Sequence, residues 1–140
     1  MYTKNIDFFS DITETNTIYI DMENGLFYLI PPFANLIFRC MLYGMSVNEI
    51  IELCSTIPEI PSDYKERINK TIKLLLEYKL IIECDNAPDF PKPELNDYLI
   101  QSIQEDDFDY TITPSNDVQK LLLDDPIHDV SLDGWSPIVK

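Results

Sequence analysis

The sequence predicts an α+β fold. We expect a winged-helix-like unit built from an N-terminal β-hairpin of two or three strands and three helices, followed by an acidic C-terminal extension. Three observations predict it. The stretch TIYIDMENGLFYLI alternates apolar and polar residues around an Asn-Gly pair, as hairpins do. Three segments with helical spacing of apolar residues follow. The chain then becomes strongly acidic and is interrupted by prolines.

The hairpin is the clearest element. Ile6, Phe8 and Ile12 suggest an irregular strand before it. In residues 17–22 the three apolar side chains at 18, 20 and 22 face one way and those at 19 and 21 face the other. Asn24-Gly25 is expected to supply two positive-φ positions for a tight turn. The returning strand, LFYLI, is apolar on both faces, so one face meets the core and the other is left for a further contact.

Three helices are expected next. The first spans residues 33–43 and ends at Gly44, with Leu36, Ile37, Cys40 and Met41 inward. Ser46 and Glu49 form a capping box, which opens a helix that buries Val47, Ile50, Ile51 and Cys54. Ser62 is expected to cap a longer helix that reaches about residue 78. Its apolar stripe is Tyr64, Ile68, Ile72, Leu75 and Leu76.

The exposed side of this last helix is basic. Lys65, Arg67, Lys70, Lys73 and Lys79 are five of the ten bases in the chain and, against Glu66 and Glu77, leave a local charge of +3. A solvated helix face with ordinary charge spacing would look the same. Beside a strand that is apolar on both faces, it also suits a wall that receives an acidic peptide, because a strand edge offers main-chain hydrogen bonds to an extended peptide.

Charge and composition divide the chain. There are 25 acidic and 10 basic residues, which gives a net charge of −15. This balance disfavours nucleic acid and anionic membranes as partners. Residues 1–83 carry −5 and residues 84–140 carry −10. We therefore expect a compact domain over 1–83, which should fold without the rest, and an acidic extension over 84–140. With no signal peptide and no long apolar run, a cytoplasmic location is expected.

The extension is expected to form short helices over residues 93–104 and 115–123, with an acidic loop between them. Near its end, Trp135 with Ile127 and Val130 is expected to anchor the tail on a surface. The nearby Asp residues and His128 match no standard metal-binding loop, so no metal and no cofactor are expected. The three cysteines show no CxxC spacing and are expected to be reduced and buried.

Residues 19–54 and 63–81 resemble the PqqD-like family, the RiPP recognition elements. The resemblance rests on the strand–Gly–strand pattern around Gly25, the helix ending at Gly44, the Ser46–Glu49 cap, and the final helix that leads to Leu80-Ile81. Two features depart from the family pattern: Pro31-Pro32 stands at the strand–helix junction, and Phe38 is the aromatic residue of the first helix. The resemblance implies a domain without catalytic residues.

That resemblance implies a function. Such a domain would bind the leader of a ribosomally synthesised precursor peptide by strand addition and present it to a separate modifying enzyme, such as a radical-SAM, cyclodehydratase or protease-like protein. The strand would be Leu26–Ile30 and the helix wall residues 64–79. The expected peptide-binding residues are Leu26, Phe27, Tyr28, Leu29, Ile30, Tyr64, Arg67, Lys70 and Lys73.

Two other functions remain open. The fold pattern also allows a winged-helix transcription regulator, although the net charge disfavours it. The acidic composition also allows an interaction or inhibitor protein that mimics nucleic acid. An enzyme is not expected, because the sequence contains one His and three Gly and shows no catalytic or phosphate-binding motif.

Overall fold

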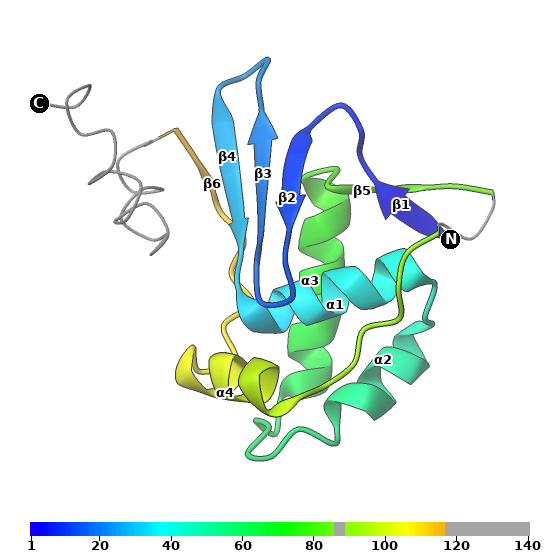
Figure 1. Cartoon of the computed structure of the whole chain (residues 1–140), viewed down its shortest axis with the longest axis vertical. Coiled ribbons are helices and arrows are strands. Elements are labelled where there is room, and N and C mark those ends of the chain that lie inside the picture. The colour runs from blue at the N-terminus through cyan, green and yellow to red at the C-terminus, as the bar shows by residue number, and fades with distance from the viewer. Residues whose placement is uncertain (86–88, 117–140) are drawn as a thin grey trace, which may run out of the picture.

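The computed structural model describes residues 1–85 and 89–116. It confirms the α+β class (Figure 1). Strands β2 (Phe9–Ile12), β3 (Thr17–Asp21) and β4 (Leu26–Ile30) form an antiparallel sheet, joined at the β4 edge by the two-residue strand β6 (Pro114–Ser115). Strands β1 (Tyr2–Lys4) and β5 (Ile81–Glu83) pair separately. The helices are α1 (Pro32–Tyr43), α2 (Val47–Cys54), α3 (Tyr64–Glu77) and α4 (Asp97–Glu105).

The hairpin register puts two different faces on β3 and β4. Thr17, Tyr19 and Asp21 are buried, whereas the isoleucines at 18 and 20 are half-buried on the opposite face. The expected alternation is therefore confirmed. Buried polar groups have partners: the Tyr19 hydroxyl donates to the Leu80 carbonyl over 2.8 Å, and burial raises the pKa of that phenol.

The hairpin turn differs from the expected one. Asp21 pairs with Leu26, so the loop contains four residues rather than two, and in it only Gly25 has positive φ. The Asp21 carboxylate accepts hydrogen bonds from the backbone N–H groups of Glu23 and Asn24 and from the Asn24 side chain, the last at 2.7 Å. That last bond is the main reason why the pKa of Asp21 is lowered. An Asx-type turn has replaced the primed turn that Asn-Gly alone suggested.

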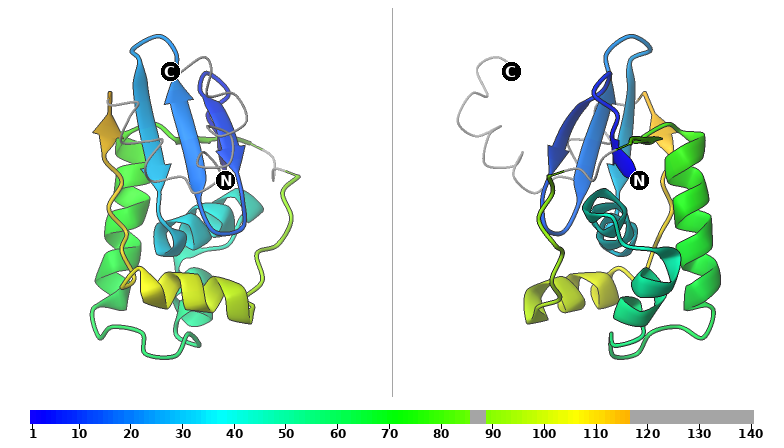
Figure 2. Two further views of the ribbon diagram at one scale, coloured as in Figure 1. Left: turned by 60° about the vertical axis from the view of Figure 1, so that its left-hand side comes forward. Right: turned by 90° about the vertical axis from the view of Figure 1, so that its right-hand side faces the viewer.

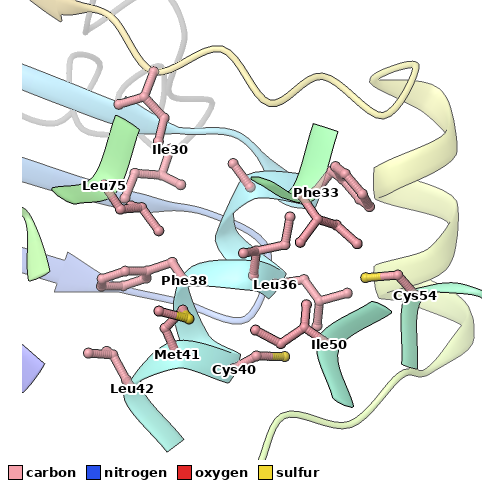
Figure 3. Packing of buried hydrophobic residues seen from close by; sticks show 14 of the residues in the cluster. Ile30, Phe33, Leu36, Phe38, Cys40, Met41, Leu42, Ile50, Cys54 and Leu75 are labelled. Atoms are coloured by element: carbon pink, nitrogen blue, oxygen red, sulfur yellow. The ribbon is translucent and has the colours of Figure 1, made fainter. Parts of the chain in front are cut away.

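Helix α1 is the centre of the core (Figure 3). It is buried almost all round, including the four side chains expected to point inward. Phe38 packs edge-on against Tyr19, with ring centroids 5.8 Å apart. Because α1 contacts α3, α4 and β1, little of its surface faces solvent.

The other helices follow the expected pattern with three exceptions. The Ser46–Glu49 capping box of α2 is present. Ser62 does not cap α3; Asp63 precedes that helix, and it makes no side-chain cap hydrogen bond. Val47 and Leu76 are exposed, at 38% and 40%, because the neighbouring elements cover only part of each helix's apolar stripe.

The extension returns to the core. Helix α4, expected over residues 93–104, is capped by Asn96 and buries Leu99 and Ile103. Phe108 and Ile112 beyond it are also buried in the same cluster. Ser115 lies in β6 and does not begin a helix. The rest of the expected 115–123 helix, from residue 117, and the tail with Trp135 lie outside the described residues.

Two cysteine thiols are sealed in this core. Cys40 and Cys54 have no exposed surface, and burial raises the pKa of each thiol to about 12. Cys84, which was also expected to be buried, is only half-buried, so that prediction is wrong for this residue. At pH 8 we expect an aromatic disulfide reagent to label Cys84 within minutes and the other two only after unfolding, since the thiolate is the reactive form. Rapid labelling of all three in the native protein would contradict this packing.

No helix in the described residues is long and apolar enough to span a membrane.

Candidate peptide-binding groove

The expected peptide groove is defined here by its two walls, strand β4 and helix α3, which Figure 2 shows. From the strand side, Tyr28 and Ile30 face inward and are buried. The Tyr28 ring lies 5.4 Å from the Tyr78 ring, just beyond α3, and stacks on Phe8 at 6.0 Å. Burial, with smaller contributions from Asp21 and Tyr78, raises the pKa of Tyr28. The side of β4 that faces the core is therefore partly aromatic and largely shielded from water.

Phe27 and Leu29 lie on the opposite face of the sheet. They pair across the ladder with Ile20 and Ile18, and all four are half-buried. Leu26 opposes Asp21 at the hairpin end and is also half-buried. Phe27 and Leu29 consequently do not face α3. A strand added at this edge would meet them only through its own outward side chains.

On the α3 side, the main candidate contact residue is Arg67. Its Nε bonds the Asp63 carboxylate at 3.0 Å, and its side chain is 24% exposed. Tyr64 is half-buried one turn earlier. Lys70 is exposed and pairs with Glu66 at 3.2 Å. This hydrogen bond is the main reason that the pKa of Lys70 is raised, and Tyr110 adds to the effect. Lys73 is exposed. Arg67 is the only one of the expected basic contacts that reaches inward.

The groove is occupied by the protein's own chain. Residues 107–115, here called the cis segment, run from the end of α4 along the space between β4 and α3 (Figure 2). Ser115 pairs with Phe27 and Pro114 with Tyr28, in antiparallel register. The strand edge that sequence reasoning left open for a peptide is thus partly covered by β6.

Arg67 holds the start of the cis segment. One guanidinium nitrogen, Nη1, donates to the Asp107 and Phe108 carbonyl oxygens over 3.3 and 3.1 Å. The guanidinium carbon lies 6.0 Å from the centroid of the Tyr110 ring. With these contacts Arg67 binds the backbone and an aromatic ring of the cis segment, and no carboxylate of that segment. An extended peptide with another sequence could therefore use the same carbonyl contacts.

Side chains of the cis segment alternate between the core and solvent. Phe108 and Ile112 are buried, Tyr110 and Pro114 are half-buried, and Thr111 and Thr113 are exposed. Phe108 meets Phe33 of α1 edge-on, with centroids 5.7 Å apart. The period of two is that of a strand with one buried face. The sequence FDYTITP shows this alternation, but its acidic residues led us to expect a loop there.

The junction with α4 is strained. Asp107 and Phe108 both have φ of 55°, a left-handed conformation that costs about 1–3 kcal/mol for a non-glycine residue. The Phe108 N–H donates to Ile103 O and the Asp107 N–H to Gln104 O, which closes the helix. Burial of Phe108 and the Arg67 contacts hold this turn in place. Sequence reasoning missed it because such turns usually contain Gly.

An acidic pocket of about 800 Å³ opens beside the cis segment, on the side of the β4–α1 junction. Its lining includes Leu29, Pro31 and Pro32 on one side and Glu105, Asp106 and Asp109 on the other. Burial, followed by repulsion from Asp109 and Asp107, raises the pKa of Asp106. In the described residues, no group of three or more His, Cys, Asp or Glu side chains is arranged to hold a metal ion.

Comparisons with protein-family models, curated proteins and solved structures found no match to this chain.

Proposed function

We propose that this protein is a non-catalytic peptide-binding module. It would bind an extended peptide by strand addition in the groove between β4 and α3 and present it to a separate modifying enzyme. The resemblance to RiPP recognition elements supplies the leader of a ribosomally synthesised precursor as the ligand. On this proposal the hairpin and α1–α3 form the winged-helix-like unit of that family, and α4 with the cis segment is an addition to it.

One observation carries the proposal: the groove already holds an extended polypeptide. The cis segment forms strand pairs with β4 and is bound through its carbonyls by Arg67. It also places alternate side chains into the core. Main-chain pairing and pockets for every second side chain are the contacts by which strand addition recognises a peptide, and Arg67 adds a polar contact to them. A surface that binds one such segment has the chemistry to bind another.

A peptide-display selection against the whole chain tests the proposal. We expect linear peptides to be enriched and to shift the amide signals of β4 and α3 in the isotope-labelled protein. We expect their affinity to fall at least ~10-fold in the double variant Lys70→Glu, Lys73→Glu, because the favoured peptides are acidic. The charge-matched control is Lys4→Glu, Lys92→Glu, which changes two exposed lysines outside the groove.

Two results would count against the proposal. Enriched peptides that shift only amides away from β4 and α3 would place binding elsewhere. Tight duplex DNA binding with a steep dependence on salt would support the transcription-regulator alternative instead, because such binding releases counterions from phosphates.

A further inference from the structure

The cis segment is held in the groove by few main-chain contacts. Strand β6 pairs with two of the five residues of β4. Of the two β6 residues, Pro114 has no N–H to donate. The other attachments of the cis segment are its side chains, inserted at every second residue, and the Arg67 contacts near residue 108. A longer strand of similar side chains could make the same insertions and add ladder hydrogen bonds along Leu29 and Ile30.

The junction at Asp107 and Phe108 also favours exchange. Both residues have a left-handed backbone, and Phe108 is held in this turn by its contact with Phe33 and by Arg67. Acidic residues at 105, 106, 107 and 109 crowd this turn and repel one another. Withdrawal of the segment would relieve both the backbone strain and the repulsion, so release is easier than the burial of its side chains alone suggests.

We propose that the cis segment is an internal ligand of the groove, and that the protein's true ligand is a peptide of the same pattern that displaces it. This inference rests on the proposed function and specifies its ligand. The pattern follows from the insertion points of the segment: aromatic residues at the positions of Phe108 and Tyr110, an aliphatic residue at that of Ile112, and Pro at that of Pro114. The residues between the last three, Thr111 and Thr113 in this chain, are exposed, and Thr111 lines the acidic pocket.

Tethering sets the strength of this competition. A segment joined to its site by a short connection acts at an effective concentration on the order of millimolar. A free peptide of equal intrinsic affinity therefore binds poorly until the internal ligand is weakened. The apparent dissociation constant of the free peptide is inversely proportional to the fraction of molecules in which the groove is open.

The test uses a fluorescent synthetic peptide with the sequence of residues 106–116, DDFDYTITPSN, added to the full chain. We expect weak binding to the wild type. We expect at least ~10-fold tighter binding to Ile112→Asp and to Tyr110→Ala, which weaken the internal ligand at a buried and a half-buried position. Tyr110→Ala guards against loss of folding in the more severe variant. Hydrogen exchange of the α1 amides monitors the core in both.

Two controls accompany the test. Thr113→Asp changes an exposed residue of the same segment and should bind the peptide as the wild type does. A peptide with Asp in place of the residues equivalent to Tyr110 and Ile112 should bind no variant.

The outcomes separate this inference from the function on which it rests. Folded variants that bind the peptide no more tightly than the wild type would overturn the internal-ligand proposal. If display-selected peptides still bound at β4 and α3, the proposed function would survive that result. If neither the synthetic nor the selected peptides bound to variants whose segment exchanges freely, both would fall.

Discussion

A chain that ends at Glu83 is expected to lose its cooperative unfolding transition. The extension provides Leu99, Ile103, Phe108 and Ile112, all buried in the same core as α1. Losing Phe108 alone is comparable to a buried Phe→Ala change, about 3–5 kcal/mol. Domains are stable by only about 5–15 kcal/mol in total. The structure thereby changes the expected result of this deletion, since composition alone suggested that residues 1–83 would fold without the rest.

The matched control is a chain that ends at Asn116, which keeps all four buried side chains and the Arg67 contacts. Thermal unfolding by circular dichroism and the dispersion of amide signals compare the two. We expect the longer chain to give a sharp transition and the shorter one to give a broad transition or none. A well-dispersed spectrum and an unchanged midpoint for the 83-residue chain would show that the extension only covers an independent domain.

The second large effect is expected at Asn35. This α1 side chain is fully buried and forms hydrogen bonds with β3 and with the loop between β2 and β3. Its Oδ1 accepts from the Thr17 hydroxyl over 2.6 Å, and its Nδ2 donates to the Thr13 carbonyl over 3.0 Å and the Glu14 carbonyl over 3.3 Å. Asn35→Ala leaves the buried Thr17 hydroxyl without its partner, at about 1–3 kcal/mol, and also removes the two bonds to the loop carbonyls. We expect a loss of roughly 2–5 kcal/mol in the free energy of unfolding.

Denaturant unfolding measures this loss, with Asn69→Ala as the control. Asn69 is an exposed residue of α3, so the same chemical change should stay within ~0.5 kcal/mol of the wild type. Adding Thr17→Val to Asn35→Leu should recover part of the loss, because removing both partners leaves fewer unsatisfied groups. Equal effects of the Asn35 and Asn69 substitutions would mean that the buried network contributes nothing.

Local signals identified most of the elements. The apolar spacing and Gly44 located α1, and the Ser46–Glu49 pair located the start of α2. These features act within a few residues of each other, so a sequence displays them directly. The ends of α3 and α4 were also expected to within about one residue, but the positive φ of Lys79 and Asp107 was not, since Gly is usual there. Neither Lys nor Asp predicts a positive φ from sequence; packing beyond the helix imposes that conformation.

The candidate site was less predictable than the elements. Arg67 was expected to meet acidic side chains of a peptide, and it binds main-chain carbonyls of the cis segment instead. Phe27 and Leu29 were expected as contacts, and their face of the strand is turned away from α3. Periodicity divides a strand into two faces without saying which face meets which neighbour.

The sequence by itself determined the α+β class, the hairpin and the helices α1–α3, because propensity, capping and periodicity act over short distances. The alternation of residues 108–114 was not predicted, because that segment was expected to be an acidic loop. Only the tertiary structure decided where that alternation is used. Pairing Pro114 and Ser115 with β4 requires residues about 87 positions apart to meet, and hydrophobic burial of Phe108 and Ile112 against α1 brings them together. Such a contact depends on the shape of the assembled core, which no local pattern encodes.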